Sequence, residues 1–148
     1  MNPDDPYDLH RFLAAQAGIY ERVLAELKGG QKRTHWMWFI FPQIDGLGYS
    51  PTAKRYAIKS REEAQQYLNH PVLGKRLLAC TEEVLALKGG SVSEIFGYPD
   101  DVKFQSSMTL FEHIAGPGSV FSISLDRYCH GERDATTLRL VEQHIPPK

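Results

Sequence analysis

The chain has 148 residues, the size of one domain, and its 42% of hydrophobic residues suffices for one sizeable core. A net charge of −1 excludes the strongly basic balance of a general nucleic-acid-binding protein. Two cysteines are too few for a disulfide framework, and we expect both to be buried free thiols. The polar, proline-containing start is unlike a signal peptide, and no apolar run reaches the roughly 20 residues that span a bilayer. We therefore expect a cytoplasmic protein without a membrane partner.

The first half of the chain contains one clear helix and one ambiguous apolar run. Apolar residues recur at helical spacing over Leu9–Leu27, with Asp8 placed to cap the start and Gly29–Gly30 to end the helix. The next run, Trp36–Phe41, is too short for its periodicity to distinguish a strand from a helix. We favour a short buried helix, because no other segment is a clear strand partner and a lone strand would leave its backbone groups unpaired.

Capping residues set the bounds of the later helices. Ser60 and Ser91 each precede a glutamate by three residues, which is the capping-box pattern, and Asp101, Ser119 and Asp134 are further N-cap residues. The predicted elements are a helical turn at Ala53–Ile58 and helices at Arg61–Asn69, Pro71–Leu87, Val92–Phe96, Val102–Ala115, Val120–Cys129 and Ala135–His144. No linker divides the chain. Residues 1–148 are therefore predicted to form a single all-α domain of about seven helices, with its core over residues 8–142, around a buried central aromatic helix.

The aromatic run is the first candidate for a site, because polar residues flank it. It holds both tryptophans, with His35 before Trp36 and Gln43 after Pro42. One interpretation is that the rings belong to the core and that His35 is a capping or satisfied core residue. The other is that one face of the run lines a cleft. There Trp38, Gln43 and His35 would contact a flat ring, such as a base or a nicotinamide-like group.

A second candidate lies at the start of the predicted helix Val102–Ala115. Polar side chains and backbone amides at a helix start favour anions. Lys103 and Ser107 are one turn apart, so they and Ser106 can share one side of the helix. They would hold a phosphate or carboxylate; the alternative is an ordinary solvated helix entry. A serine nucleophile would need a base within hydrogen-bond reach, and no nucleophile-elbow pattern is present.

The third candidate is Asp126, on an otherwise apolar helix face. A carboxylate there must be paired or solvated. It either forms a salt bridge with Arg55 or Lys103 or acts as a general base. The neighbouring Cys129–His130 has no second pair at ligand spacing, so we predict no metal site. Glycine-rich phosphate loops, zincin motifs and Rossmann fingerprints are also missing from the sequence, and we predict no cofactor.

Several motifs together resemble one protein family. They are His35–Gln43, Tyr56–Ile58, His70–Gly74, Ile95–Gly97, Asp101–Lys103 and Ser106–Phe111. Over about residues 8–142 the chain resembles the DUF1810 family, some members of which carry the label calpastatin. The resemblance implies a multihelical fold with buried central helices, and it supplies no catalytic roles because the family is uncharacterised. The label implies a protease inhibitor, yet this core-rich chain is unlike a disordered inhibitor repeat.

Two functional hypotheses follow. In the first, the protein binds, and in one version hydrolyses, a small polar or phosphorylated ligand that is nucleotide-like or ADP-ribose-like. The aromatic run would hold the ring, the helix start would hold the anionic group, and His35 or Asp126 would move the proton. A looser similarity to NADAR-type helical domains, which act on ADP-ribose linkages, accompanies this hypothesis. In the second, the protein is a non-enzymatic interaction module that docks an unidentified partner protein through the aromatic segment.

Overall fold

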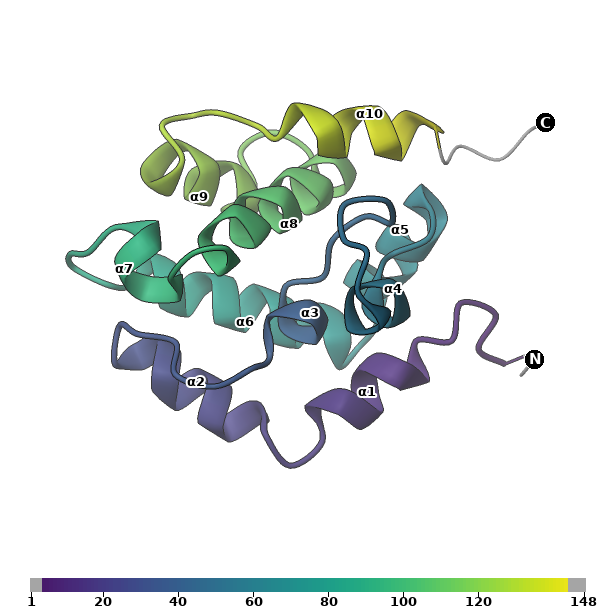
Figure 1. The fold of residues 1–148 in the computed structure, drawn as a ribbon, viewed down its shortest axis with the longest axis horizontal. Coiled ribbons are helices and arrows are strands. Elements are labelled where there is room, and N and C mark those ends of the chain that lie inside the picture. Colours follow the sequence, from purple (N-terminus) through teal and green to yellow (C-terminus); the bar gives the residue numbers. More distant parts are fainter. Residues whose placement is uncertain (1–3, 144–148) are drawn as a thin grey trace.

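The computed structural model describes residues 4–143, in which ten helices pack around one hydrophobic core (Figure 1). The helices are α1 (His10–Gln16), α2 (Tyr20–Lys28), α3 (Met37–Ile40), α4 (Pro51–Tyr56), α5 (Arg61–Asn69), α6 (Leu73–Leu85), α7 (Val92–Phe96), α8 (Asp100–Ala115), α9 (Val120–Tyr128) and α10 (Ala135–Gln143). The all-helical fold is as predicted, but the described range has ten helices rather than about seven. Three of them, α3, α4 and α7, have six residues or fewer, so tertiary packing must stabilise them. None of the helices within this range is long and apolar enough to cross a membrane.

The first predicted helix is divided in two, which corrects the expectation of one continuous element. α1 ends at Gln16 and α2 begins at Tyr20, and Gly18 between them has a left-handed φ of 78°. The Gln16 side-chain amide donates to the Phe39 carbonyl at 2.7 Å and to the Tyr67 hydroxyl at 3.2 Å. The break lets α1 pack on α3 while α2 packs on α6. Both halves bury one face against the same core, so the apolar spacing continues through the break.

Most of the predicted serine and aspartate caps are formed. Ser91, Ser119 and Asp134 each accept a backbone N–H bond at the start of α7, α9 and α10, and Ser91 belongs to a complete capping box. The box predicted at α5 is only half formed. Ser60 accepts a bond from the Glu63 amide, but the Glu63 carboxylate turns away to a distant partner. The sequence pattern therefore identified the helix start correctly and the role of Glu63 wrongly.

Two predicted caps, Asp8 and Asp101, do not stand at the helix start as expected. Asp8 has a left-handed φ of 51°, and Asp5 caps α1 instead, accepting bonds from the amides of Leu9 and His10 at 2.8 and 2.9 Å. α8 begins one residue before Asp101, which therefore lies inside the helix rather than capping it. Both differences amount to one or a few residues at a helix end, where backbone geometry rather than residue type decides the assignment. The predicted His144 end of the last helix lies outside the described residues.

The aromatic run lies at the centre of the molecule, as predicted, and forms a short helix. α3 contacts α1, α4, α6 and α8. The Phe41 ring meets the rings of Phe96 and Phe104 edge-on, at centroid distances of 5.8 and 5.2 Å. Trp38 and Phe39 are half-buried. The residues of the run that are at most 2% exposed are Trp36, Met37, Ile40 and Phe41.

α8 is the second central element, and a β-bridge fixes the loop that faces it. All but one of the residues from Phe104 to Phe111 are buried, because α8 packs against α5, α7, α9 and α10 (Figure 1). Opposite its start, the loop after α3 is held by an isolated parallel bridge between Ile44 and Ile58. The Ile58 amide donates to the Gln43 carbonyl at 2.8 Å. Through this bond the bridge fixes the backbone position of Gln43.

Both cysteines are buried free thiols, as predicted. Burial raises the pKa of Cys80 to about 12 and that of Cys129 to about 11. Neither thiol is therefore ionised at neutral pH, and both act as small apolar core residues.

Candidate functional site

A single buried carboxylate, Glu26 on α2, fixes the segment that leads into α3. It accepts bonds from the Arg33 amide at 2.7 Å, the Thr34 amide at 3.0 Å and hydroxyl at 2.7 Å, and the Trp36 indole at 2.9 Å. Burial by itself raises the pKa of this carboxyl, but the four hydrogen bonds outweigh burial and lower the pKa to about 2. An ionised Glu26 thus fixes the position of the first tryptophan.

Two lysines lie over the two tryptophans, and one aspartate joins them. The ammonium of Lys32 is 5.2 Å from the Trp36 ring centroid, and that of Lys103 is 4.8 Å from the Trp38 ring centroid. Asp100, in the first turn of α8, contacts Lys32 at 2.7 Å and Lys103 at 3.5 Å. Two cations therefore share one anion, and this group of side chains retains one net positive charge. The Lys32 side chain is 7% exposed and that of Lys103 is 24% exposed, so Lys103 is the more accessible cation.

A cleft of about 260 Å³ opens beside Lys103, and we call it the Lys103 cleft. Its walls come from the loop after α3, α4, the start of α8 and the start of α10. Three of the predicted ligand-binding residues, Gln43, Lys103 and Ser106, line it. The complete lining is Gln43, Leu47, Gly48, Ala53, Tyr98, Pro99, Val102, Lys103, Ser106, Asp134 and Thr136.

The polar groups in the Lys103 cleft differ in how far the protein already satisfies them. Gln43 accepts a hydrogen bond through its backbone carbonyl, whereas its side-chain amide has no partner among residues 4–143, so the donor and acceptor of that amide can both serve a ligand. The Ser106 hydroxyl donates to the Val102 carbonyl one turn earlier at 3.1 Å, and lies 3.4 Å from the Asp134 carboxylate. Tyr98 is 85% exposed at the rim.

Trp38 lies next to this cleft rather than in it. A second hollow, lined by Trp38, Gln43, Tyr56 and their neighbours, has a volume of only about 10 Å³. That volume is about one water-sized probe sphere. In addition, the Lys103 ammonium covers one face of the Trp38 ring. The expected stacking of a flat ligand ring on Trp38 therefore has no room in this arrangement, and Trp38 instead supports Lys103.

The other predicted site residues lie elsewhere. His35 is exposed before α3 and is outside the lining of the Lys103 cleft. The Ser107 side chain is fully buried, and its hydroxyl has no hydrogen-bond partner among the described residues. Asp126 is 65% exposed and forms an ion pair with Arg133 at 3.0 Å, rather than with Arg55 or Lys103. His35 and Asp126 are thus not positioned to move a proton at the cleft.

The backbone amides at the start of α8 are already engaged. The amide of Asp101 donates to the Gly97 carbonyl at 2.8 Å, and the amides of Val102 and Lys103 donate to the Pro99 carbonyl at 3.1 and 3.2 Å. These groups were expected to favour an anion, but they have internal acceptors. Attraction of an anion to this helix start therefore depends on the Lys103 side chain.

Four residues at the candidate site were not among the predicted site residues. Asp100, Tyr98 and Asp134 stood in the sequence as ordinary turn or capping residues, and Thr136 carried no signal. Only the packing of the α10 start beside α8 brings Asp134 and Thr136 to Lys103. Tyr98 precedes Lys103 by five residues across a turn. This short spacing is the one feature of the sequence that indicates the two side chains lie close together.

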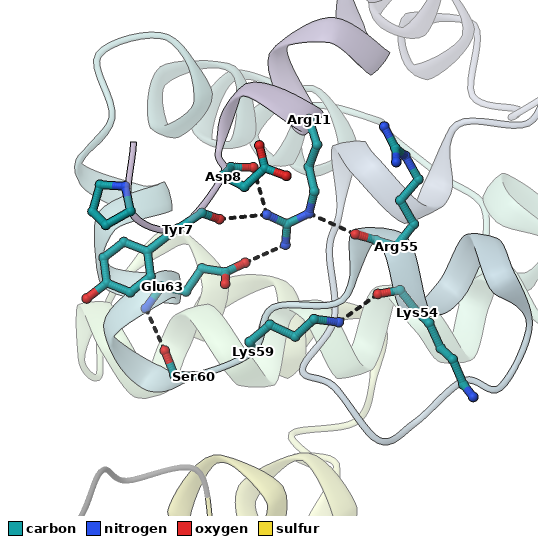
Figure 2. A pocket seen from close by; sticks show the side chains of 9 residues that line it. Tyr7, Asp8, Arg11, Lys54, Arg55, Lys59, Ser60 and Glu63 are labelled. Carbon is teal, nitrogen blue, oxygen red and sulfur yellow. Dashed lines mark hydrogen bonds and ion pairs between the residues drawn. The ribbon is translucent and has the colours of Figure 1, made fainter. Parts of the chain in front are cut away.

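A larger hollow of about 650 Å³ lies between α1, α4 and the start of α5 (Figure 2). At its base is the buried pair of Arg11 and Glu63, 2.6 Å apart. The five N–H groups of Arg11 are all used: four donate to backbone carbonyls and the fifth to Glu63. Burial raises the pKa of Glu63 above its usual value, and the hydrogen bond and charge of Arg11 offset only part of that rise. Arg11 is therefore a structural clamp without a free donor.

The other cations of this hollow do not converge on its centre. Lys59 donates to the Lys54 carbonyl at 2.6 Å. Figure 2 shows the side chains of Lys54 and Arg55 extending away from the Arg11–Glu63 pair in opposite directions. The hollow is thus larger than the Lys103 cleft but presents no set of polar groups aimed at one point, so the Lys103 cleft is the better candidate site.

The fold and the cleft define a single-domain, all-helical protein with a small polar hollow at the start of its central helix. Among residues 4–143, no group of three or more histidine, cysteine, aspartate or glutamate side chains is placed to hold a metal ion.

The chain belongs to the DUF1810 family, described as proteins of unknown function, and the family match spans residues 6–141. It is similar to the crystal structure of the conserved hypothetical protein Rv1873 from Mycobacterium tuberculosis. The sequences are 51% identical and the TM-score is 0.91, over 93% of this chain and 99% of that one. None of the curated proteins matches the chain. The comparisons therefore establish the family and the fold, and the function has to be argued from the site.

Proposed function

We propose that this protein binds a small, polar, anionic ligand in the Lys103 cleft. The observation that carries the proposal is that Lys103, Gln43, whose side-chain amide is unpaired, and Ser106 all line one hollow. These groups come from two segments that are about 60 residues apart in sequence. Concave sites lined by a few convergent polar groups on a mostly apolar wall are typical of small-molecule binding.

The local charge balance supports an anion as the ligand. Asp100 compensates one of the two lysines it contacts, and the remaining positive charge is largely shielded from solvent beside two indole rings. Charge interactions at such partly buried positions are stronger than at a free surface, because the surrounding dielectric constant is lower. A phosphate or carboxylate that contacts Lys103 would offset this positive charge.

The volume of the cleft limits the ligand. A volume of 260 Å³ holds about nine water-sized groups. A small phosphorylated or carboxylated metabolite fits this space, whereas only part of an ADP-ribose-like molecule would lie within it. The nucleotide-like ligand stays a proposal in a narrower form, in which the cleft holds the anionic portion and the exposed Tyr98 ring at the rim contacts the rest.

The proposal is limited to binding. The Ser106 hydroxyl donates to the Val102 carbonyl, and the Asp134 oxygen 3.4 Å from it already accepts bonds from the amide and hydroxyl of Thr137, so this contact gives no support for a serine nucleophile. The alternative function, an interaction module that docks through the aromatic segment, has less support, because four residues of that segment are at most 2% exposed. We also place the protein in the cytoplasm, where its two free thiols would stay reduced.

A thermal-shift screen tests the proposal, with inorganic phosphate, AMP, ADP-ribose and NAD as probes. We expect a shift with at least one phosphate-bearing probe, its loss in Lys103→Gln, and a severalfold higher affinity in Asp100→Asn, which frees the cations from their shared carboxylate. Lys54→Gln, in the larger hollow, is the control and should leave the shift unchanged. Equal shifts in wild type and Lys103→Gln, or no shift with any probe, would refute the proposal.

A further inference from the structure

Asp134 lines the same cleft as Lys103, and one of its two carboxylate oxygens accepts no hydrogen bond from the described residues. One oxygen of Asp134, Oδ2, accepts bonds from the amide and hydroxyl of Thr137 and lies 3.4 Å from the Ser106 hydroxyl. The other oxygen, Oδ1, accepts no hydrogen bond from any residue in the range 4–143, and no lysine or arginine in that range pairs with Asp134. The cleft therefore has a positive wall at Lys103 and a negative wall at Asp134.

We propose that the Lys103 cleft selects ligands that carry an anionic group and an ammonium group together. This inference rests on the proposed function, since it concerns the specificity of the same site. The anionic group would contact Lys103 and Gln43, and the ammonium group would donate to Asp134 Oδ1.

The Lys103 wall and the Asp134 wall contribute to this selectivity through opposite charges. A purely anionic ligand gains from Lys103 but is repelled by Asp134, which nothing neutralises in the described structure. An ammonium group turns that repulsion into attraction, so the same carboxylate rejects one ligand class and favours the other. The bonds from Thr137 hold Asp134 in place, so the carboxylate is oriented before the ligand arrives.

The size of the cleft agrees with such a ligand. About nine water-sized groups is the scale of a short zwitterion such as a phosphorylated amino alcohol. Thr136, two residues after Asp134, also lines the cleft, and Leu47 contributes an apolar residue from the loop after α3. A two-carbon link between the charged ends could lie along that apolar surface.

Two probe molecules of the same size test the ammonium contact separately from the phosphate contact. O-phosphoethanolamine and propyl phosphate differ in having an ammonium or a methyl group at the same end. By calorimetric titration we expect the wild-type protein to bind O-phosphoethanolamine about tenfold more tightly, the scale of one charge-assisted hydrogen bond. Asp134→Asn should bind both probes equally, because asparagine keeps the α10 cap and removes the charge. Lys103→Gln should weaken both.

The controls distinguish a failure of this inference from a failure of the proposed function. Asp126→Asn removes a carboxylate outside the cleft and should retain the tenfold preference, and the melting temperature of Asp134→Asn should confirm that α10 is intact. Equal binding of the probes to the wild type, or a preference that survives in Asp134→Asn, would overturn this inference alone. If neither probe binds, this inference fails as well, and if binding does not depend on Lys103 the proposed function fails with it.

Discussion

Replacement of Glu26 by glutamine is the most direct test of how the aromatic segment is anchored. A glutamine would turn its NH2 group toward groups that are themselves donors, so at least one of the four hydrogen bonds to the Glu26 carboxylate is lost. The fall of the pKa from 4.5 to about 2 corresponds to about 3 kcal/mol of stability. Allowing for solvent screening at the open side of the carboxylate, we expect Glu26→Gln to lose about 2 kcal/mol near neutral pH.

The stability difference between wild type and Glu26→Gln should depend on pH, and the direction of the pKa shift fixes the direction of that dependence. Because folding lowers the pKa of Glu26, its contribution is complete above the unfolded pKa of about 4.5 and is lost as the pH falls from there toward about 2. Urea unfolding of wild type and Glu26→Gln should therefore show a stability difference that shrinks by about 2 kcal/mol across this window. Glu21→Gln, an exposed change on the same helix, should stay within about 0.5 kcal/mol of wild type. A wild-type advantage over Glu26→Gln that is independent of pH would refute the reasoning.

Two further predictions concern buried positions on α6 and α8. A Cβ added at Gly74 would lie 1.9 Å from the Leu68 carbonyl oxygen, so Gly74→Ala should cost about 3 kcal/mol or more in chemical denaturation, although alanine favours helix. Gly89→Ala, where a Cβ meets nothing within 4 Å, should be nearly neutral, and equal effects at the two glycines would contradict the packing argument. Ser107→Ala should leave stability unchanged or raise it by up to about 1 kcal/mol, because it removes a buried hydroxyl that has no partner in the described range. Ser124→Ala, at an equally buried hydroxyl that bonds a carbonyl, should lose about 1 kcal/mol by the same measurement, and a loss as large in Ser107→Ala would indicate an undetected partner.

Local signals in the sequence account for most of the helices. Ser91 with Glu94, and Ser119, are caps whose effect reaches only three residues, so the sequence contains all the information they need. Glu63 shows where this locality ends. It stands at the capping-box position, yet a buried arginine 52 residues earlier offers its carboxylate a stronger, charge-assisted bond. The choice between the two partners depends on the fold, and no pattern around Glu63 contains it.

The sequence pattern did not reveal the break between α1 and α2, for a related reason. Hydrophobic periodicity reports which residues face the core, and it is unaffected by a turn that leaves both helices facing the same core. Gly18 was the available cue, because a left-handed residue in mid-helix favours glycine. A glycine within a helical pattern is common enough that the cue is weak without knowledge of where α2 packs.

The candidate site was predictable only in part, because its residues obey two different kinds of constraint. Lys103 and Ser106 share a helix face by spacing alone, and Gln43 follows the aromatic run, so their types and positions pointed to a polar ligand from the outset. Asp126 and Ser107 seemed equally suitable, but their surroundings were decided by packing: one faces solvent beside Arg133 and the other faces the core.

The polar residue that competes with a ligand for Lys103 lies beside the cleft and outside its lining. Asp100 holds Lys103 and Lys32 in place over the indole rings, and any anion that enters must compete with it for Lys103. The Lys103 contact, at 3.5 Å, is longer than the Lys32 contact at 2.7 Å. Lys103 is therefore the cation that Asp100 holds less firmly, and Lys32 can keep the carboxylate paired when Lys103 turns to a ligand. A lysine held in position by a shared partner is ordered before binding, which offsets part of the cost of competing with that partner. This arrangement favours a binding role for the cleft over a purely structural one, because a structural ion pair needs only one lysine for each carboxylate.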